Sequence, residues 1–184
     1  MIESEFKILL SAAQYAKIRD YFAWDEQISQ TNHYFDTDSL DLRERHITCR
    51  AREIAGDYFL QIKLPTNEVF SRVELEKKLD FLPEELFGSE LRELAGETVF
   101  PDVKRLGALH TNRLVKRFNG AEIDLDESNY FGKTDYELEI EFTDEKAARE
   151  LLAEVLEIIG ENPSESVVCK GKVQRFIEEF LLSK

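Results

Sequence analysis

Apolar and charged residues alternate along several segments of this chain, and such alternation predicts β-strands. The first strand is expected over residues 2–8, before any residue that could cap a helix or turn the backbone. Successive side chains on a strand point to opposite faces, so Glu3, Glu5 and Lys7 share one face and the apolar residues share the other. One face of this strand therefore carries both signs of charge.

The same alternation predicts the later strands. They are expected at 33–37, 46–53, 58–64, 70–79, 111–118, 121–127, 136–142 and around 167–172. Gly56-Asp57 is expected to join two of them, and Asn119-Gly120 is the strongest hairpin signal in the chain.

Helices are expected where the apolar residues recur every three or four positions, the spacing of one face of an α-helix. Ser11 can cap a helix that ends near Trp24, and a short helix is expected from Pro83 to Gly96. An amphipathic helix is expected over 144–159, and a last helix carries Phe176 and its apolar neighbours.

The polar faces of the predicted strands repeat one composition. They use Arg, Lys, Glu and Asp almost to the exclusion of neutral residues, and each has an apolar face opposite. The sets, strand by strand, are Arg50 and Arg52; Gln61 and Lys63; Arg72, Glu74, Glu76 and Lys78; Glu122, Asp124 and Asp126; and Glu137, Glu139 and Glu141. A single wet face is ordinary in an antiparallel sheet. Because amphipathic helices are available to cover the apolar faces, the set predicts an α+β fold with an eight-stranded antiparallel β-barrel, a charged interior and helices packed outside. We expect one domain over residues 1–184.

Composition narrows the possible partners. The formal net charge of −14 argues against a nucleic-acid surface, while it allows a small anion in a local basic pocket. Cys49 and Cys169 lack partners at metal-ligand spacing and are interpreted as reduced thiols. No apolar run is long enough to cross a membrane and no leader is recognised, so a cytoplasmic protein is expected. The oligomeric state is left open.

Several motifs, in order, resemble the CYTH family, the triphosphate tunnel metalloenzymes. They are Glu3-x-Glu5-x-Lys7, His33-Tyr34-Phe35-Asp36-Thr37, Arg50-x-Arg52, Lys63 before Pro65, Arg72-x-Glu74-x-Glu76, Glu137-x-Glu139-x-Glu141, and Lys170-Gly171-Lys172 with Arg175-Phe176. Within the family the chain looks closest to small stand-alone bacterial members of the Bacillus type. The resemblance implies a tunnel that holds a triphosphate together with Mg²⁺ or Mn²⁺.

The resemblance also implies roles for individual residues. The expected metal ligands are Glu3, Glu5, Glu139 and Glu141, followed by Glu74, Glu76, Asp126 and Glu137. The expected phosphate-binding cations are Lys7, Arg50, Arg52, Lys63, Arg72, Arg113, Lys172 and Lys170. Glu3, Glu5, Lys7, Lys63 and Tyr34 are the expected catalytic residues. For Tyr34 two interpretations stand, a place beside the leaving group and simple packing. One departure from the family pattern is Thr111, where a second cation often precedes the position of Arg113.

The implied activity is metal-dependent hydrolysis of a compact triphosphate with release of orthophosphate. Inorganic triphosphate is the first candidate substrate and thiamine triphosphate the second. Two alternatives stay open: a class IV adenylyl cyclase that makes cyclic AMP from ATP, and a sensor that binds polyphosphate or nucleotide without turnover. The sequence favours hydrolysis because the glutamate sets are intact and no adenine pocket is evident.

Overall fold

The computed structural model describes residues 2–66, 71–96, 99–161 and 170–184, with only the backbone described at residues 2, 3 and 71. The strands are β1 (Ile2–Leu10), β2 (Glu26–Asp36), β3 (Thr48–Ile54), β4 (Asp57–Pro65), β5 (Ser71–Leu79), β6 (Glu85–Leu86), β7 (Val103–Phe118), β8 (Ala121–Tyr130) and β9 (Lys133–Phe142). The helices are α1 (Ala12–Tyr21), α2 (Asp41–Glu44), α3 (Gly88–Ala95), α4 (Glu145–Ile159) and α5 (Lys172–Leu182).

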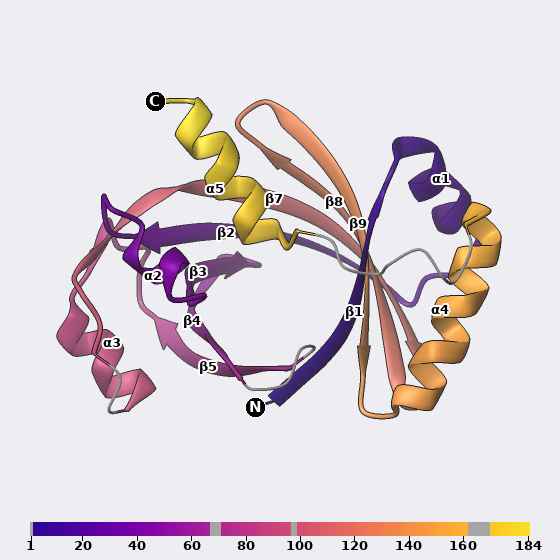
Figure 1. Ribbon diagram of the computed structural model, residues 1–184, viewed down its shortest axis with the longest axis horizontal. Helices are drawn as coiled ribbons and strands as arrows, with labels where there is room; N and C mark the ends of the chain where they lie inside the picture. The colour runs from indigo at the N-terminus through magenta and orange to yellow at the C-terminus, as the bar shows by residue number, and fades with distance from the viewer. Residues whose placement is uncertain (1, 67–70, 97–98, 162–169) are drawn as a thin grey trace.

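The strands form a closed antiparallel barrel (Figure 1). Their order is β2-β3-β4-β5-β1-β9-β8-β7-β6, and β2 also pairs with β7 from Glu26 opposite Val115 to Asp36 opposite Lys104. Within the described part of the chain, eight strands therefore close a ring. The two-residue β6 pairs with the first two residues of β7. The predicted eight-stranded antiparallel barrel is confirmed.

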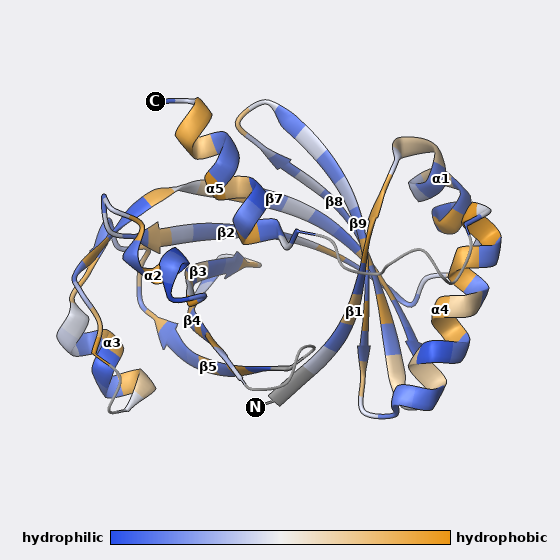
Figure 2. Ribbon diagram, viewed as in Figure 1, coloured by the Kyte–Doolittle hydropathy of each residue, from blue (hydrophilic) through white to orange (hydrophobic). Residues whose placement is uncertain are grey.

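The apolar strand faces point outward and are covered by helices, as predicted. Figure 2 shows polar and apolar residues alternating along the strands. Phe6 and Ile140 are direct cross-strand partners in an apolar layer that α1 and α4 cover. A second apolar layer, which includes Cys49 and Ile62, lies on the outer face of β3 and β4 next to α2 and α3. Burial of these faces drives the barrel to close with its charged residues inside.

Helix α5 packs differently from α1 to α4. Its Phe176 and Ile177 contact Tyr34, Leu109 and Tyr130 in a separate apolar cluster. Tyr34 is the direct cross-strand partner of Arg50 and therefore shares the inner face with it. Helix α5 thus places apolar side chains against the inner face of β2, β7 and β8, and it begins beside the charged interior.

Several predicted boundaries were wrong. Strand β2 begins at Glu26 and β7 at Val103, both well before the predicted starts. The helix expected from Pro83 is instead the short strand β6 followed by α3, and α2 was not predicted. Of the strand expected near 167–172, residues 167–169 lie outside the described residues, and Lys172 is the first residue of α5.

None of the described helices has the length and apolar character that a membrane span requires.

Candidate functional site

Three neighbouring strands line one side of the barrel interior with carboxylates. Glu5 is the direct partner of Glu141, and Asp126 is the direct partner of Glu137, so the acidic residues of β1, β9 and β8 face one another across the sheet. We call this set the acidic wall: Glu5, Asp124, Asp126, Glu137, Glu139 and Glu141. Like charges directly opposite on a sheet repel. The wall therefore requires cations between its carboxylates.

Glu139 is the carboxylate with the most cationic contacts in the described acidic wall. Its Oε1 accepts from Lys7 at 2.6 Å and from Lys172 at 2.8 Å, and its Oε2 accepts from Arg113 at 2.7 Å. Burial by itself would raise the pKa of Glu139, but Lys172, Lys7 and Arg113 outweigh it and hold that pKa well below its usual range. Glu139 is therefore an ionised carboxylate deep in the barrel.

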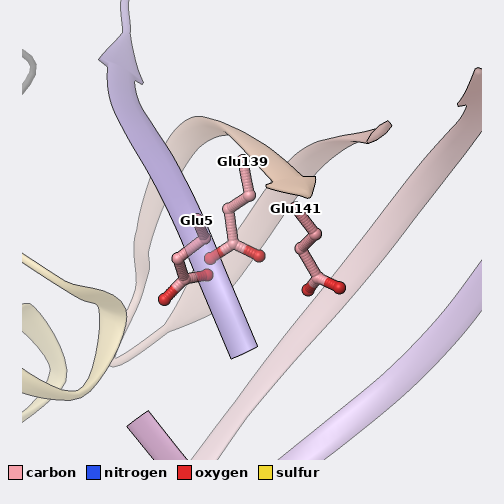
Figure 3. Close-up of side chains that lie close together, drawn as sticks. All are labelled: Glu5, Glu139 and Glu141. Carbon is pink, nitrogen blue, oxygen red and sulfur yellow. The ribbon is translucent and has the colours of Figure 1, made fainter. Parts of the chain in front are cut away.

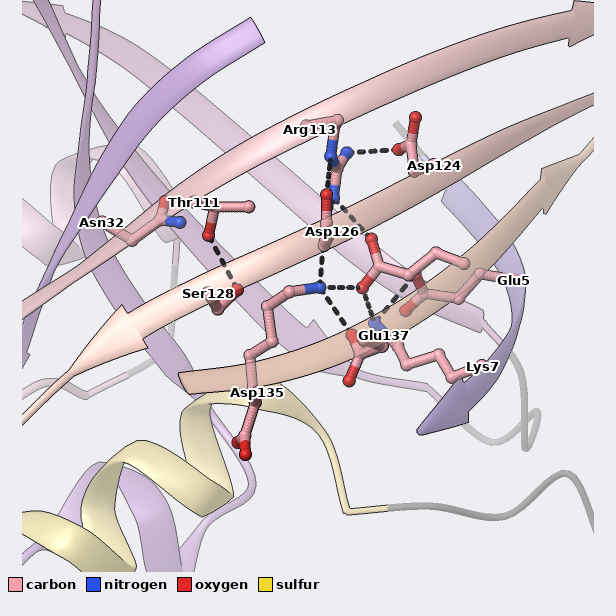
Figure 4. A network of polar contacts seen from close by, with 12 residues as sticks. Glu5, Lys7, Asn32, Thr111, Arg113, Asp124, Asp126, Ser128, Asp135 and Glu137 are labelled. Carbon is pink, nitrogen blue, oxygen red and sulfur yellow. Dashed lines mark hydrogen bonds and ion pairs between the residues drawn. The ribbon is translucent and has the colours of Figure 1, made fainter. Parts of the chain in front are cut away.

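Arg113 is saturated by the acidic wall (Figure 4). Its Nε and Nη2 donate to the two oxygens of Asp126 at 2.8 and 2.7 Å, and its Nη1 contacts Asp124. Nη2 also donates to Glu139. Burial opposes its charge, yet these carboxylates raise the pKa of Arg113 well above its usual range. Its charge is paired with the acidic wall in this structure, and a phosphate-binding role for Arg113 stays a prediction.

Lys172 and Arg175 bring the start of α5 to the acidic wall. The Lys172 ammonium lies 2.7 Å from Asp126 and donates to Glu137 at 2.5 Å. One turn later, Arg175 donates to Glu137 at 2.6 Å and to Asp135 at 2.8 Å. The neighbouring Lys170 is exposed and pairs with Glu178 at 2.9 Å, so it does not join this cluster.

The acidic wall offers donor sets that suit a divalent cation. Carboxylate oxygens of Glu5, Glu139 and Glu141 lie within 4.8 Å of one another (Figure 3), and those of Glu122, Asp124 and Glu141 form a second such group. Oxygen-rich carboxylate sets are what Mg²⁺ and Mn²⁺ prefer. Asp124 Oδ1 is buried and accepts no hydrogen bond from the described residues. The residues therefore fit a metal ion.

Asp124 also has an unusual proton affinity. Its pKa is raised to about 8, mainly by burial; Arg113 acts in the opposite direction, and Glu139 and Glu141 act with burial. Three carboxylates share the Arg113 guanidinium, so the acidic wall holds more negative charge than its own cations neutralise. An additional cation would relieve that excess.

The opposite side of the interior is basic, and we call its cations Arg50, Arg52, Lys63 and Arg72 the basic wall. Arg50 and Arg52 on β3 share the inner face, and each donates its Nε to a neutral amide, Gln61 at 2.8 Å and Asn32 at 3.4 Å respectively. On the next strand, Lys63 lies 2.7 Å from Glu74 of β5. Arg72 and Glu76 project from the same face of β5 by the strand register. Because Lys7 and Lys63 keep side-chain exposures of 26% and 21% while pointing inward, solvent reaches both walls.

One predicted catalytic residue packs in an apolar cluster, and another is described only by its backbone. Tyr34 is buried, and its ring centroid lies 4.7 Å from that of Phe176 in the cluster under α5. For Glu3 the structure describes the backbone pairing with Arg72, while its side chain lies outside the described residues.

Sequence reasoning assigned no role to some residues that complete the interior. These are Asn32, Gln61, Glu122, Asp124, Asp135 and Arg175. Strand alternation had already placed Gln61 and Asp124 on polar faces, and that signal could have found both. Arg175 was noted only as part of a family motif and was given no role, because it meets Glu137 only after α5 docks on the barrel.

Comparisons with known proteins agree with this architecture. The CYTH domain matches residues 1–167. "Putative triphosphatase YjbK" from Bacillus subtilis is 32% identical over 186 residues, with 97% of this chain and 95% of that protein covered. An antiparallel barrel with a charged interior and helices outside defines a class of proteins. Within this class, the chain belongs to the CYTH family.

Solved structures with the same fold span most of the chain. A "putative adenylate cyclase" from Bacillus halodurans has a TM-score of 0.75 and 26% identity, covering 95% of this chain and 96% of that one. A Hippeastrum protein, described as a "putative adenylyl cyclase" with "a dominant triphophatase activity", has a TM-score of 0.69 and 22% identity, covering 97% and 95%. The second likeness establishes the fold alone.

Proposed function

We propose that this protein hydrolyses a compact triphosphate, inorganic triphosphate first, with the help of Mg²⁺ or Mn²⁺. The observation that carries the proposal is the division of the interior into an acidic wall and a facing pair of arginines. A metal-bound polyphosphate presents both signs of charge, so it complements both walls at once. The name of the Bacillus subtilis relative points to the same activity.

The acidic residues of the interior would bind the metal, and the basic residues would bind the phosphate groups. Glu5, Glu139 and Glu141 would hold the cation, and the sequence adds Glu3, Asp126 and Glu137 as further candidate ligands. When bound, the cation neutralises phosphate oxygens and polarises the phosphorus under attack. Arg50 and Arg52 would bind phosphate oxygens through their forked Nη groups. Lys63 would add a single ammonium contact, and Arg72 would add a bidentate guanidinium contact. Lys7 would stay between the metal ligands and the phosphate.

In the proposed reaction, water forms a bond to the terminal phosphorus while the bridging P–O bond breaks in line. Inorganic triphosphate then yields orthophosphate and pyrophosphate. Negative charge grows on the equatorial and leaving oxygens during this step, and the inward cations are placed to neutralise it. Glu74 and Glu76 face Lys63 and Gln61, and we assign them to orienting the basic wall before metal binding.

The test is a substrate panel with product analysis. Purified protein with Mg²⁺ or Mn²⁺ is incubated with inorganic triphosphate, thiamine triphosphate or ATP. We expect orthophosphate to form fastest from inorganic triphosphate. Cyclic AMP and pyrophosphate formed from ATP at an equal or greater rate would instead establish a cyclase, the activity in the description of the Bacillus halodurans structure. Binding of all three compounds without turnover would establish a sensor.

A further inference from the structure

Two buried neutral amides hold the two inward arginines of β3. Gln61 Oε1 accepts from Arg50 Nε at 2.8 Å, and Asn32 Oδ1 accepts from Arg52 Nε at 3.4 Å. Gln61 is 2% exposed and Asn32 is 1% exposed, so both amides are buried and neither belongs to the solvated surface. Each contact uses the single Nε–H of its arginine, and no residue in the described part of the chain is hydrogen-bonded to the forked Nη groups.

The orientation of Gln61 is fixed by its position between opposite charges. Arg50, Gln61 and Glu76 are direct partners across β3, β4 and β5. The Gln61 amide nitrogen donates to Glu76 Oε2 at 2.7 Å, so the amide oxygen must face Arg50. The amide separates a guanidinium from a carboxylate that would otherwise neutralise it.

The contrast with Arg113 indicates what this arrangement achieves. Three carboxylates neutralise Arg113, whereas the described residues make no ion pair with Arg50 or Arg52. Burial, with repulsion from Arg50 and Arg113, lowers the pKa of Arg52 to about 10. Arg52 is still charged at neutral pH, and that charge is poorly compensated. An anion placed between the two forks would relieve it.

We propose that Asn32 and Gln61 are positioning residues for the substrate: their neutral amide oxygens fix Arg52 and Arg50 while keeping both guanidinium charges available for phosphate. This inference rests on the proposed function and deepens it, because it names what keeps the charges of Arg50 and Arg52 uncompensated. A carboxylate at either position would form an internal ion pair and compete with the phosphate oxygens for the same arginine.

The deciding comparison is between Asn32→Asp and Asn32→Ala. The aspartate is isosteric and adds a charge beside Arg52, whereas the alanine removes the hydrogen bond and leaves Arg52 charged. Binding of inorganic triphosphate is measured by titration calorimetry in a chelator, so that no turnover or metal binding contributes. We expect the aspartate variant to bind at least about tenfold more weakly than the alanine variant, the size of effect typical of hydrogen bonds to charged groups.

A merely structural role predicts the opposite order, because alanine removes more contacts than aspartate does. Equal affinities, or weaker binding by the alanine variant, would therefore overturn the inference. Melting temperatures of the ligand-free proteins supply an independent readout: the new ion pair should leave the aspartate variant more stable than the alanine variant. Gln61→Glu compared with Gln61→Ala makes the same test if an Asn32 variant fails to fold.

A matched control adds the same charge outside the interior. Asn112 on β7 is the direct partner of Ser29 and alternates with the inward Arg113, so it lies on the outer face. Asn112→Asp should bind triphosphate as the wild type does. The substrate panel tests the hydrolase separately: a wild type that binds triphosphate without hydrolysing it would refute the proposed function and leave this comparison valid. A wild type that binds neither triphosphate nor pyrophosphate would overturn the inference itself.

Discussion

Lys7 on β1 donates a 2.6 Å hydrogen bond to Glu139, its direct cross-strand partner on β9. Burial by itself would lower the pKa of Lys7, but Glu139 and Glu5 outweigh that effect and raise it. The pair joins the amino-terminal strand to the acidic wall. It also places a permanent cation beside the carboxylates that are proposed to hold the metal, so the wall is partly neutralised before any ligand arrives.

Glu139→Gln should abolish turnover while retaining binding of triphosphate. The substitution removes one ligand charge and leaves the arginines of the basic wall in place. We expect the rate of orthophosphate release to fall at least about a hundredfold, since a catalytic cation supplies several kcal/mol. Glu150→Gln, at an exposed residue of α4, is the control. A Glu139→Gln variant with full activity would contradict the metal assignment.

Lys172 and Lys170 form a natural comparison because they lie two residues apart in different surroundings. Lys172→Met leaves three buried carboxylates short of a cation, and we expect a loss of about 3–5 kcal/mol in the free energy of unfolding. Lys170→Met breaks only an exposed pair and should cost about 0–1 kcal/mol. Denaturant titration of both variants measures the difference. Equal losses would show that α5 is not secured by Lys172.

Tyr34→Phe separates the two roles considered for that residue. Its ring packs on Phe176, so the phenylalanine variant should keep its melting temperature and its turnover within about twofold, while Tyr34→Ala should lose about 3–5 kcal/mol of stability. Steady-state rates and thermal melts of both variants are the measurements. A tenfold or greater loss of kcat in a fully stable Tyr34→Phe protein would instead assign the hydroxyl to catalysis.

Cys49 should resist thiol reagents in the native protein. Burial raises the pKa of its thiol, with a smaller contribution from Asp36, so the reactive thiolate is absent near pH 8. In a Cys169→Ser background, labelling with an aromatic disulfide reagent should proceed only as the protein unfolds in denaturant. Rapid labelling of the native protein would mean that the apolar layer next to α2 and α3 opens readily.

Local alternation predicted most of the barrel because one face of each strand is apolar and covered. It failed at the beginning of β2, where Ile28 is the single apolar residue among residues 26–32 and no alternation results. On the outer side of this region, Thr31 contacts His110 of β7 at 3.3 Å in a polar layer, so no apolar period is required there. The long pairing of β2 with β7 closes the barrel, and hydrophobic alternation does not predict it.

By itself, the sequence determined which residues share a strand face, because the two-residue period of a strand is a local property. It therefore placed Glu5, Lys7, Arg50, Arg52 and Glu139 inside a charged barrel. Only the tertiary structure decided which charges are neutralised: Arg113 meets three carboxylates, whereas Arg50 and Arg52 meet neutral amides. The reason is physical. Ion pairing depends on which strands become neighbours and on where α5 docks, and those contacts join residues far apart in the chain.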